Sequence, residues 1–425
     1  MVRFIMQKQL PFVLFFFFLL CGGLLYAQDI TQQIVSNRKN DASQINKPYI
    51  IYISADGFRY DYADKYQAKN LLALREKGVK AVSMKPSYPS VTFSNHYTLA
   101  TGMYPSGHGI VNNSFYDPKR QQIYVKTNLA AIKDGTWYGG VPIWVLAEQQ
   151  KMLSAAFYWL GSETAVLGVR PTYWYNFNTK IPMDERIAAV KNWLQLPEDK
   201  RPHLINFYFP EVDVAGHHFG SESKEVADAV KLVDNCIGEM VQLTKDIGLD
   251  VNFVFVSDHG MANVDNVNTI PLPSIVDKDK FIVPNGDALI QIYAKGKKDV
   301  KPLYKSLKQE AVDYEVYLTN KMPKRWHYRA KDNKDGRIGD IILIPHLPKV
   351  FNLTGKPTTV GKHGFDNDMP DMQATFYAWG PAFKEGLTIN SFENVHVYPL
   401  LAKILGLRYH HKIDGDIKVL ESVLK

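Results

Sequence analysis

Tyr49-Ile50-Ile51-Tyr52-Ile53 runs into Ser54-Ala55-Asp56-Gly57, so a continuous β-forming segment ends at a carboxylate and a glycine. A segment that is apolar at successive positions is typical of a strand buried on both faces of a parallel sheet. The pattern recurs at residues 204–209 and 251–256, and more weakly at 374–378. These segments predict strands of one sheet.

Helical spacing of apolar residues lies between the predicted strands, at residues 183–194 and 222–247. Strands that alternate with helices predict an α/β fold, with a doubly wound, mostly parallel sheet flanked by helices. Such sheets bind ligands beyond the carboxyl ends of their strands. Asp56, Asp213 and Asp258 fall just past three of those ends, so we interpret them as a site rather than as surface charge.

Residues from about 280 to 350 have a different pattern. They read as strand, helix, strand and strand, with a Lys-rich loop at residues 324–337. Because the Gly361-Lys362-His363-Gly364 segment follows them, we expect a small α+β insertion within one catalytic domain of residues 47–425.

Residues 1–27 have the features of a signal peptide. Arg3 and Lys8 precede an apolar stretch at residues 11–25, and the segment ends at the small residue Ala27. We expect cleavage there and export to the periplasm or the extracellular space; the alternative is an uncleaved N-terminal anchor. The sequence has no second apolar run long enough to span a bilayer, and we expect the polar residues 28–46 to form a flexible leader.

The formal net charge of the 425-residue chain is +7, and it falls to +5 when the two basic residues of the signal peptide are removed. With no basic tract that alternates with aromatic residues, a nucleic-acid polymer is not indicated as a partner. Cys21 leaves with the signal peptide, so Cys236 has no partner for an intramolecular disulfide. We expect Cys236 to be packed in a helix.

Short segments supply a set of acidic and histidine side chains. Asp213 and His217 are four residues apart, Asp258 and His259 are adjacent, and His363 lies in a polar loop. Singly, each has an ordinary explanation, such as a buried Asp–His hydrogen bond or an exposed histidine. Together with Asp56 they provide three carboxylates and three imidazoles, which suit two adjacent metal ions.

Thr92 lies in a hydroxyl-rich loop just before a predicted helix at residues 95–101. A helix N-terminus offers free N–H groups and the positive end of its dipole to a phosphate. A threonine hydroxyl needs a metal ion to become a nucleophile near neutral pH. By chemistry alone, Thr92 competes for this role with Ser87, Ser90 and Ser94.

Longer motifs surround these residues and follow one another from residue 49 to about residue 405. They include Ala55-Asp56-Gly57, Thr92-Phe93-Ser94-Asn95-His96-Tyr97, Thr101-Gly102-Met103-Tyr104-Pro105, His108-Gly109-Ile110-Val111-Asn112-Asn113, Ser257-Asp258-His259-Gly260-Met261 and His363-Gly364-Phe365-Asp366-Asn367. In these motifs and their order the chain resembles the nucleotide pyrophosphatase/phosphodiesterases of the alkaline phosphatase superfamily.

The resemblance implies an alkaline-phosphatase-like fold and two zinc ions. One ion would bind Asp213, His217 and His363, and the other Asp56, Asp258, His259 and Thr92. Thr92 would also be the nucleophile, and Asn113 would donate to a nonbridging phosphate oxygen. Phe93, Tyr175 and Tyr208 would stack on a nucleotide base. Val212, Leu160 and Ser94 stand where the family often has proline, which bears on the shape of the pocket rather than on the chemistry.

The nucleophile loop favours a phosphodiester over a monoester. Residues 86–95 contain no arginine, Lys85 lies only at the edge, and Val91 before Thr92 is apolar. A single uncharged Asn113 suits a singly charged diester better than a dianion.

The sequence therefore predicts an exported, zinc-dependent nucleotide pyrophosphatase/phosphodiesterase with small nucleotides as substrates. It would release nucleoside 5′-monophosphates through a covalent phosphothreonine. The alternatives are a phospholipase-C-like choline phosphodiesterase, a phosphate monoesterase or phosphonate hydrolase on the same fold, and a non-catalytic binding protein. The oligomeric state is left open.

Overall fold

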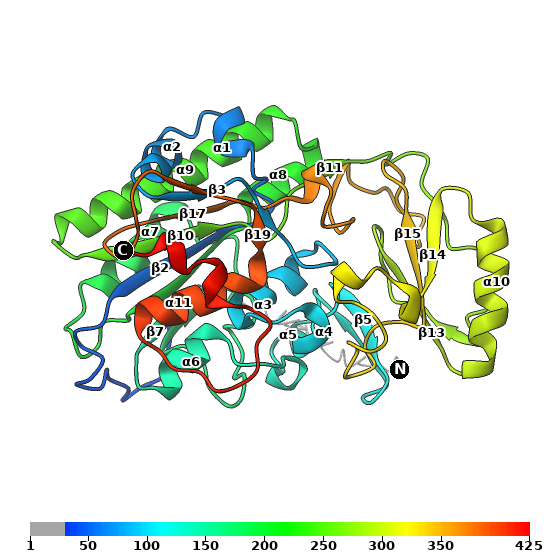
Figure 1. Cartoon of the computed structure of the whole chain (residues 1–425), viewed down its shortest axis with the longest axis horizontal. Helices are drawn as coiled ribbons and strands as arrows, with labels where there is room; N and C mark the ends of the chain where they lie inside the picture. The colour runs from blue at the N-terminus through cyan, green and yellow to red at the C-terminus, as the bar shows by residue number, and fades with distance from the viewer. Residues whose placement is uncertain (1–29) are drawn as a thin grey trace, which may run out of the picture.

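The computed structural model describes residues 30–425 (Figure 1). The predicted signal peptide at residues 1–27 lies outside the described residues. Within residues 30–425, no helix combines the length and the apolar character needed to cross a bilayer.

A mixed sheet, nine-stranded within the described residues, is the middle layer of the larger lobe (Figure 1). Its strands lie in the order β1 (Gln33–Ile34), β8 (Tyr173–Tyr175), β7 (Ser154–Phe157), β9 (Leu204–Phe209), β2 (Tyr49–Ala55), β10 (Val251–Val256), β17 (Phe376–Trp379), β3 (Val79–Ala81) and β18 (Leu387–Ile389). The run from β8 to β10 is parallel throughout. The prediction of a mostly parallel α/β sheet is confirmed.

Different helices cover the two faces of this sheet. Ile50 and Tyr52 of β2 point into one core, whereas Ile51 and Ile53 point into the other. Successive side chains of a strand face opposite sides, so the continuous apolar run is buried twice. Full burial of each such side chain stabilises the fold by roughly 1.5–3 kcal/mol.

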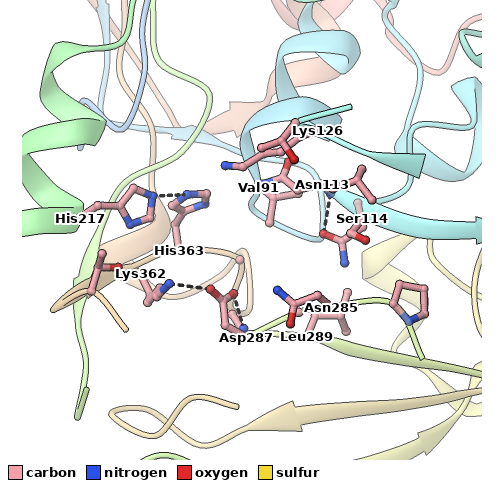
Figure 2. A pocket seen from close by; sticks show the side chains of 18 of the residues that line it. Val91, Asn113, Ser114, Lys126, His217, Asn285, Asp287, Leu289, Lys362 and His363 are labelled. Carbon is pink, nitrogen blue, oxygen red and sulfur yellow. Dashed lines mark hydrogen bonds and ion pairs between the residues drawn. The ribbon is translucent and has the colours of Figure 1, made fainter. Parts of the chain in front are cut away.

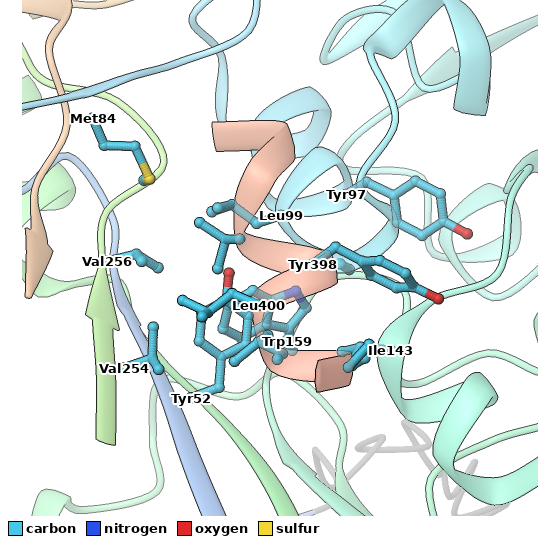
Figure 3. Close-up of a cluster of buried hydrophobic side chains, with 14 of the residues drawn as sticks. Tyr52, Met84, Tyr97, Leu99, Ile143, Trp159, Val254, Val256, Tyr398 and Leu400 are labelled. Carbon is cyan, nitrogen blue, oxygen red and sulfur yellow. The ribbon is translucent and has the colours of Figure 1, made fainter. Parts of the chain in front are cut away.

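The first core lies under α3 (Thr92–Thr101), α6 (Ile143–Gln149) and α11 (Val397–Leu405). Figure 3 shows Tyr52 and Val254 of the sheet facing Leu400 of α11. The second core lies under α2 (Lys69–Glu76), α7 (Met183–Leu194), α8 (Glu211–Phe219) and α9 (Lys224–Asp246). Cys236 is buried in α9, as expected.

One predicted strand differs in direction. The weak signal at residues 374–378 corresponds to β17, which pairs antiparallel with β10. A run of apolar residues indicates that a strand is buried, but it does not indicate whether the strand is parallel or antiparallel to its neighbours. The direction of β17 follows from where the chain returns to the sheet.

Residues 281–345 form the expected small α+β insertion, the smaller lobe at the right of Figure 1. Its antiparallel sheet has the order β12 (Phe281–Ile282), β13 (Ile290–Ala294), β15 (Ile341–Pro345) and β14 (Tyr314–Leu318), packed against α10 (Val300–Glu310). Buried Arg337 ties this lobe to the larger one. Its Nε atom lies 2.8 Å from Asp117 Oδ2, and its Nη1 atom donates to the carbonyl oxygens of Gly109 and Trp137.

The expectation of a flexible leader is wrong for residues 33–40. Strand β1 adds to the edge of the main sheet by pairing with β8. Asn40 is 3% exposed, donates to the carbonyl oxygens of Glu198 and Arg201, and accepts from the Leu153 N–H group. Polar residues suggested solvation, but they satisfy buried backbone groups instead.

Short elements complete the larger lobe. They are α1 (Tyr62–Lys65), α4 (Pro105–His108), α5 (Leu129–Ile132), the pair β4 (Met84–Lys85) and β19 (Phe392–Glu393), the hairpin β5 (Ser114–Asp117) and β6 (Gln122–Val125), and the pair β11 (Ala262–Asn263) and β16 (Gly361–Lys362).

Candidate active site

Two neighbouring parallel strands bring Asp56 and Asp258 together. Strand β2 ends one residue before Asp56, and β10 ends two residues before Asp258. The strands pair in register, so both carboxylates leave the same edge of the sheet. The N–H group of Gly57 donates to Asp258 Oδ1 at 3.1 Å, which fixes that carboxylate.

Gly57 and Gly361 allow α8 to pack closely against the end of β2 and against the loop that carries His363. Gly57 has φ +66°, which disfavours a side chain, and a Cβ atom there would lie 3.0 Å from Asp213 Cα. A Cβ atom at Gly361 would overlap a backbone carbonyl oxygen of α8. Because glycine has no Cβ, α8 with Asp213 and His217 can reach the strand ends beside the loop that carries His363.

The first group of ligands gathers around His259. Its Nε2 atom lies 3.3 Å from Asp56 Oδ1 and 2.9 Å from Asp258 Oδ2. All three side chains are buried and lie within reach of one metal ion.

The second group gathers around Asp213. Its Oδ1 atom lies 3.4 Å from His217 Nε2 and 3.6 Å from His363 Nε2, and these two nitrogen atoms are 3.2 Å apart. The rings of His259 and His363 stack with centroids 3.6 Å apart, so the two groups adjoin. The structure thus brings together all six Asp and His residues that the sequence predicted as metal ligands.

Each imidazole of the site is held through its Nδ1 atom. The Nδ1 atoms of His217, His259 and His363 lie 2.8, 2.8 and 2.9 Å from backbone carbonyl oxygens. A carbonyl oxygen only accepts, so Nδ1 carries the proton and Nε2 presents a lone pair. Burial lowers the pKa of His363 well below its usual value, which keeps that ring neutral. Metal-binding histidines are held in this way.

Three carboxylate oxygens face those lone pairs without a hydrogen-bond donor among the described residues. They are Asp56 Oδ1, Asp213 Oδ1 and Asp258 Oδ2, all buried. Burial, with the charges of Asp258 and Asp213, raises the pKa of Asp56 well above its usual value. Buried carboxylates and lone pairs repel one another unless a cation lies among them. The Asp and His side chains are therefore arranged so that they could hold metal ions.

Thr92 is the hydroxyl that meets this cluster. It is the first residue of α3, and its Oγ1 atom lies 3.2 Å from His259 Nε2. The competing hydroxyls are engaged or buried elsewhere. Ser87 donates to a side-chain amide oxygen and Ser90 to a backbone carbonyl, while Ser94 is buried in α3 without a partner.

Asn113 is held at the N-terminus of α3. Its Oδ1 atom accepts from the N–H group of Phe93 at 3.1 Å. The amide oxygen is thereby occupied, which leaves the NH₂ group as the donor toward a ligand.

Tyr208 contacts the metal-ligand cluster directly. Its hydroxyl donates to Asp56 Oδ2 at 2.6 Å, and its ring meets His96 edge to face. The sequence did not predict this contact between Tyr208 and Asp56. Phe93 is half-buried and packs edge to face on Tyr124.

Tyr175 does not join these rings. It packs against Phe157 and Trp193 in the second core. Phe177, two residues later and 49% exposed, has its ring centroid 6.3 Å from that of Tyr208. Phe177 rather than Tyr175 is therefore the residue of this segment whose ring lies near that of Tyr208. Several aromatic residues crowd the segment, and their spacing alone does not choose between them.

His96 also contacts this cluster, which its position in the Thr92-Phe93-Ser94-Asn95-His96-Tyr97 segment does not by itself indicate. Its Nε2 atom lies 2.8 Å from Ser54 Oγ, and its Nδ1 atom lies 3.0 Å from the Thr92 carbonyl oxygen and 3.3 Å from Asp258 Oδ2. His96 thus links the first turn of α3 to a metal-ligand carboxylate.

A cavity of about 650 Å³ opens beside His217 and His363 (Figure 2). The larger lobe contributes Asn113 and Lys126 to its wall, and the insertion contributes residues 283–289. The first group of ligands and Thr92 do not line it. The cavity therefore lies on the side of the second group.

Comparison with known proteins places this geometry in a family. Residues 50–366 match the type I phosphodiesterase/nucleotide pyrophosphatase family. A pyrophosphatase/phosphodiesterase of Schizosaccharomyces pombe is 36% identical over 392 residues, which cover 88% of this chain and 80% of that protein. Mouse bis(5′-adenosyl)-triphosphatase is 32% identical, with coverage of 89% and 82%. Mouse ectonucleotide pyrophosphatase/phosphodiesterase family member 1 is 34% identical over 86% of this chain, which spans 41% of that longer protein.

Solved structures agree with the sequence comparison. Murine ectonucleotide pyrophosphatase/phosphodiesterase 5 superposes with a TM-score of 0.82 at 27% identity, covering 89% of this chain and 100% of that one. An inactive variant of the same murine protein, solved in complex with AMP, has a TM-score of 0.82 at 26% identity. The chain thus belongs to the type I phosphodiesterase/nucleotide pyrophosphatase family of hydrolases.

Proposed function

We propose that the protein is an exported, zinc-dependent nucleotide pyrophosphatase/phosphodiesterase that releases nucleoside 5′-monophosphates through a phosphothreonine. The observation that carries the proposal is the position of Thr92 Oγ1, 3.2 Å from His259 and beside two adjoining acid–histidine groups. The AMP complex of the murine relative supports a nucleotide as the substrate. Export rests on the N-terminal sequence, which lies outside the described residues.

Zinc would be held by the two groups, Asp56, Asp258, His259 and Thr92 in one and Asp213, His217 and His363 in the other. When bound, two such ions supply the positive charge that activates a hydroxyl and stabilises charge on phosphate oxygens. The Nδ1 contacts orient the three rings, and the hydroxyl of Tyr208 orients Asp56.

The reaction at Thr92 has two displacements. Thr92 Oγ1 loses its proton to solvent and forms a bond to phosphorus as the bond to the leaving oxygen breaks; the leaving group departs with that electron pair, and a phosphothreonine diester results. Water then attacks phosphorus, one of its protons restores the hydroxyl of Thr92 as the Oγ1–P bond breaks, and the nucleoside 5′-monophosphate is released. The N-terminus of α3 and the NH₂ group of Asn113 provide fixed dipoles for the phosphate oxygens, and one such donor is typically worth about 100-fold in rate.

A diester remains the favoured substrate. Lys85, the only cation at the edge of the nucleophile loop, forms an ion pair with Asp368 at 2.5 Å. Its charge is thus balanced before a substrate arrives. Phe93, Tyr208 and Phe177 offer aromatic surface for a base, since any base has a face that can stack.

The first experiment compares hydrolysis of the p-nitrophenyl ester of thymidine 5′-monophosphate with that of p-nitrophenyl phosphate by the zinc-loaded protein. We expect a large preference for the diester, abolished in Thr92→Ala and largely kept in the matched Thr92→Ser. A preference for the monoester would move the protein among the phosphatases. Activity only on choline phosphodiesters would select the phospholipase-C-like alternative, and no turnover of any of these would indicate a binding protein.

A further inference from the structure

The cavity lies where a leaving group would be. In a displacement at phosphorus the attacking and leaving oxygens are roughly in line, on opposite sides of the phosphorus atom. Thr92, the attacking group, stands at the first ligand group. The cavity adjoins His217 and His363 of the second group instead. Given the proposed function, its lining therefore contacts the departing part of the substrate.

Three side chains with a full charge line the cavity: Lys126, Lys362 and Asp287. Lys362 Nζ lies 2.8 Å from Asp287 Oδ2, so these two charges offset each other. Among the described residues, Lys126 forms no ion pair, and its side chain is exposed. Figure 2 shows it extending toward the His217–His363 pair. The cavity thus carries one uncompensated positive charge.

The uncharged residues that line the cavity in the described part of the chain include no large aromatic side chain. No Phe, Tyr or Trp is among the lining residues of the described chain. The cavity therefore offers neither a stacking surface for a base nor an aromatic cage for a trimethylammonium group. It does offer polar groups from Thr127 and Asn285. A cation among amide and hydroxyl groups suits phosphate oxygens.

We propose that Lys126 binds a phosphate of the leaving group and is a residue by which the protein distinguishes a phosphorylated leaving group from an aryl one. ATP has a phosphorylated leaving group, whereas the p-nitrophenyl ester of a nucleotide does not. The inference rests on the proposed function and adds a specificity-determining residue to it.

The test compares kcat/KM for ATP, which releases pyrophosphate, with kcat/KM for the p-nitrophenyl ester of thymidine 5′-monophosphate. In Lys126→Ala we expect about a tenfold loss for ATP, the size of one charge-assisted hydrogen bond. The aryl ester should change less than about twofold, and Lys126→Arg should restore most of the ATP activity. The loss should shrink at high salt, because an exposed charge is screened.

Lys301→Ala is the matched control, because it removes the same charge from an exposed position on α10. It should leave both substrates unchanged. An equal loss on both substrates in Lys126→Ala, or no loss on either, would overturn the role of Lys126 while leaving the proposed function intact. A wild-type protein that hydrolyses neither substrate would overturn the proposed function itself.

Discussion

Replacing Tyr208 with Phe separates two roles that one side chain could have. The hydroxyl of Tyr208 donates to Asp56 Oδ2 at 2.6 Å, and its ring stands beside Phe177. The substitution removes the hydrogen bond and keeps the ring. A role in holding the metal ligand would therefore be lost, whereas a role in stacking on a base would be kept.

The expected loss of zinc affinity follows from the hydrogen bond between Tyr208 and Asp56. A hydrogen bond to a charged group contributes roughly 1.5–3 kcal/mol, and partners of metal ligands typically affect metal affinity by about 10- to 100-fold. We expect Tyr208→Phe to weaken zinc binding by about that factor. Activity should fall at limiting zinc and recover at saturating zinc, with little change in KM.

The assay is competition for zinc against a chromophoric chelator, followed by a zinc titration of activity. Tyr175→Phe is the matched control, since Tyr175 packs against Phe157 and Trp193 away from the ligands. A zinc affinity within twofold of the wild type in Tyr208→Phe would refute the ligand-holding role. A large rise in KM at saturating zinc would show instead that the hydroxyl contacts the substrate.

Three further outcomes are expected. Phe177→Ala should raise KM for a nucleotide ester by about 5- to 150-fold, because stacking on a base is worth roughly 1–3 kcal/mol; an unchanged KM in steady-state kinetics would place the base elsewhere. Chelation should lower the Tm in calorimetry, because ions that bind only the folded state stabilise it; superimposable melting curves would mean that the cluster binds no metal. Burial lowers the pKa of His108 from 6.5 to about 3. Between these two pH values, His108 is therefore protonated in the unfolded chain and neutral in the folded protein. The free energy of unfolding should fall by about 1.4 kcal/mol per pH unit from this residue as the pH drops below 6.5. When the free energy of unfolding is measured in urea at several pH values from 5 to 6.5, it should change less steeply with pH in His108→Gln than in the wild type. An equal dependence on pH in the two proteins would contradict the lowered pKa of His108.

Local patterns determined much of this protein. Continuous apolar runs located β2, β9 and β10, because a strand buried on both faces must be apolar at successive positions. The acidic residues that follow those runs indicated the site, since parallel strands end at one edge of the sheet. The quoted motifs then indicated the family, which the comparisons confirm.

Other features depended on contacts between distant segments. Residues 33–40 look solvated in sequence, yet β1 completes a sheet edge. Thr92 rather than Ser90 meets His259, although only one residue separates them, because Thr92 begins α3 and its hydroxyl faces the cluster, whereas Ser90 donates to a backbone carbonyl oxygen. Periodicity reports whether a side chain is buried, not what it is buried against.

The same limit explains the surroundings of the site. The hydroxyl of Tyr208 reaches Asp56, 152 positions away in the chain, only because β9 pairs with β2. Lys126 lines a cavity only because the insertion supplies the other wall of that cavity. The sequence by itself determined the strands, the ligand types and the family. Strand register and the packing of the two lobes, which join residues with no local relationship, decided the partners of each side chain.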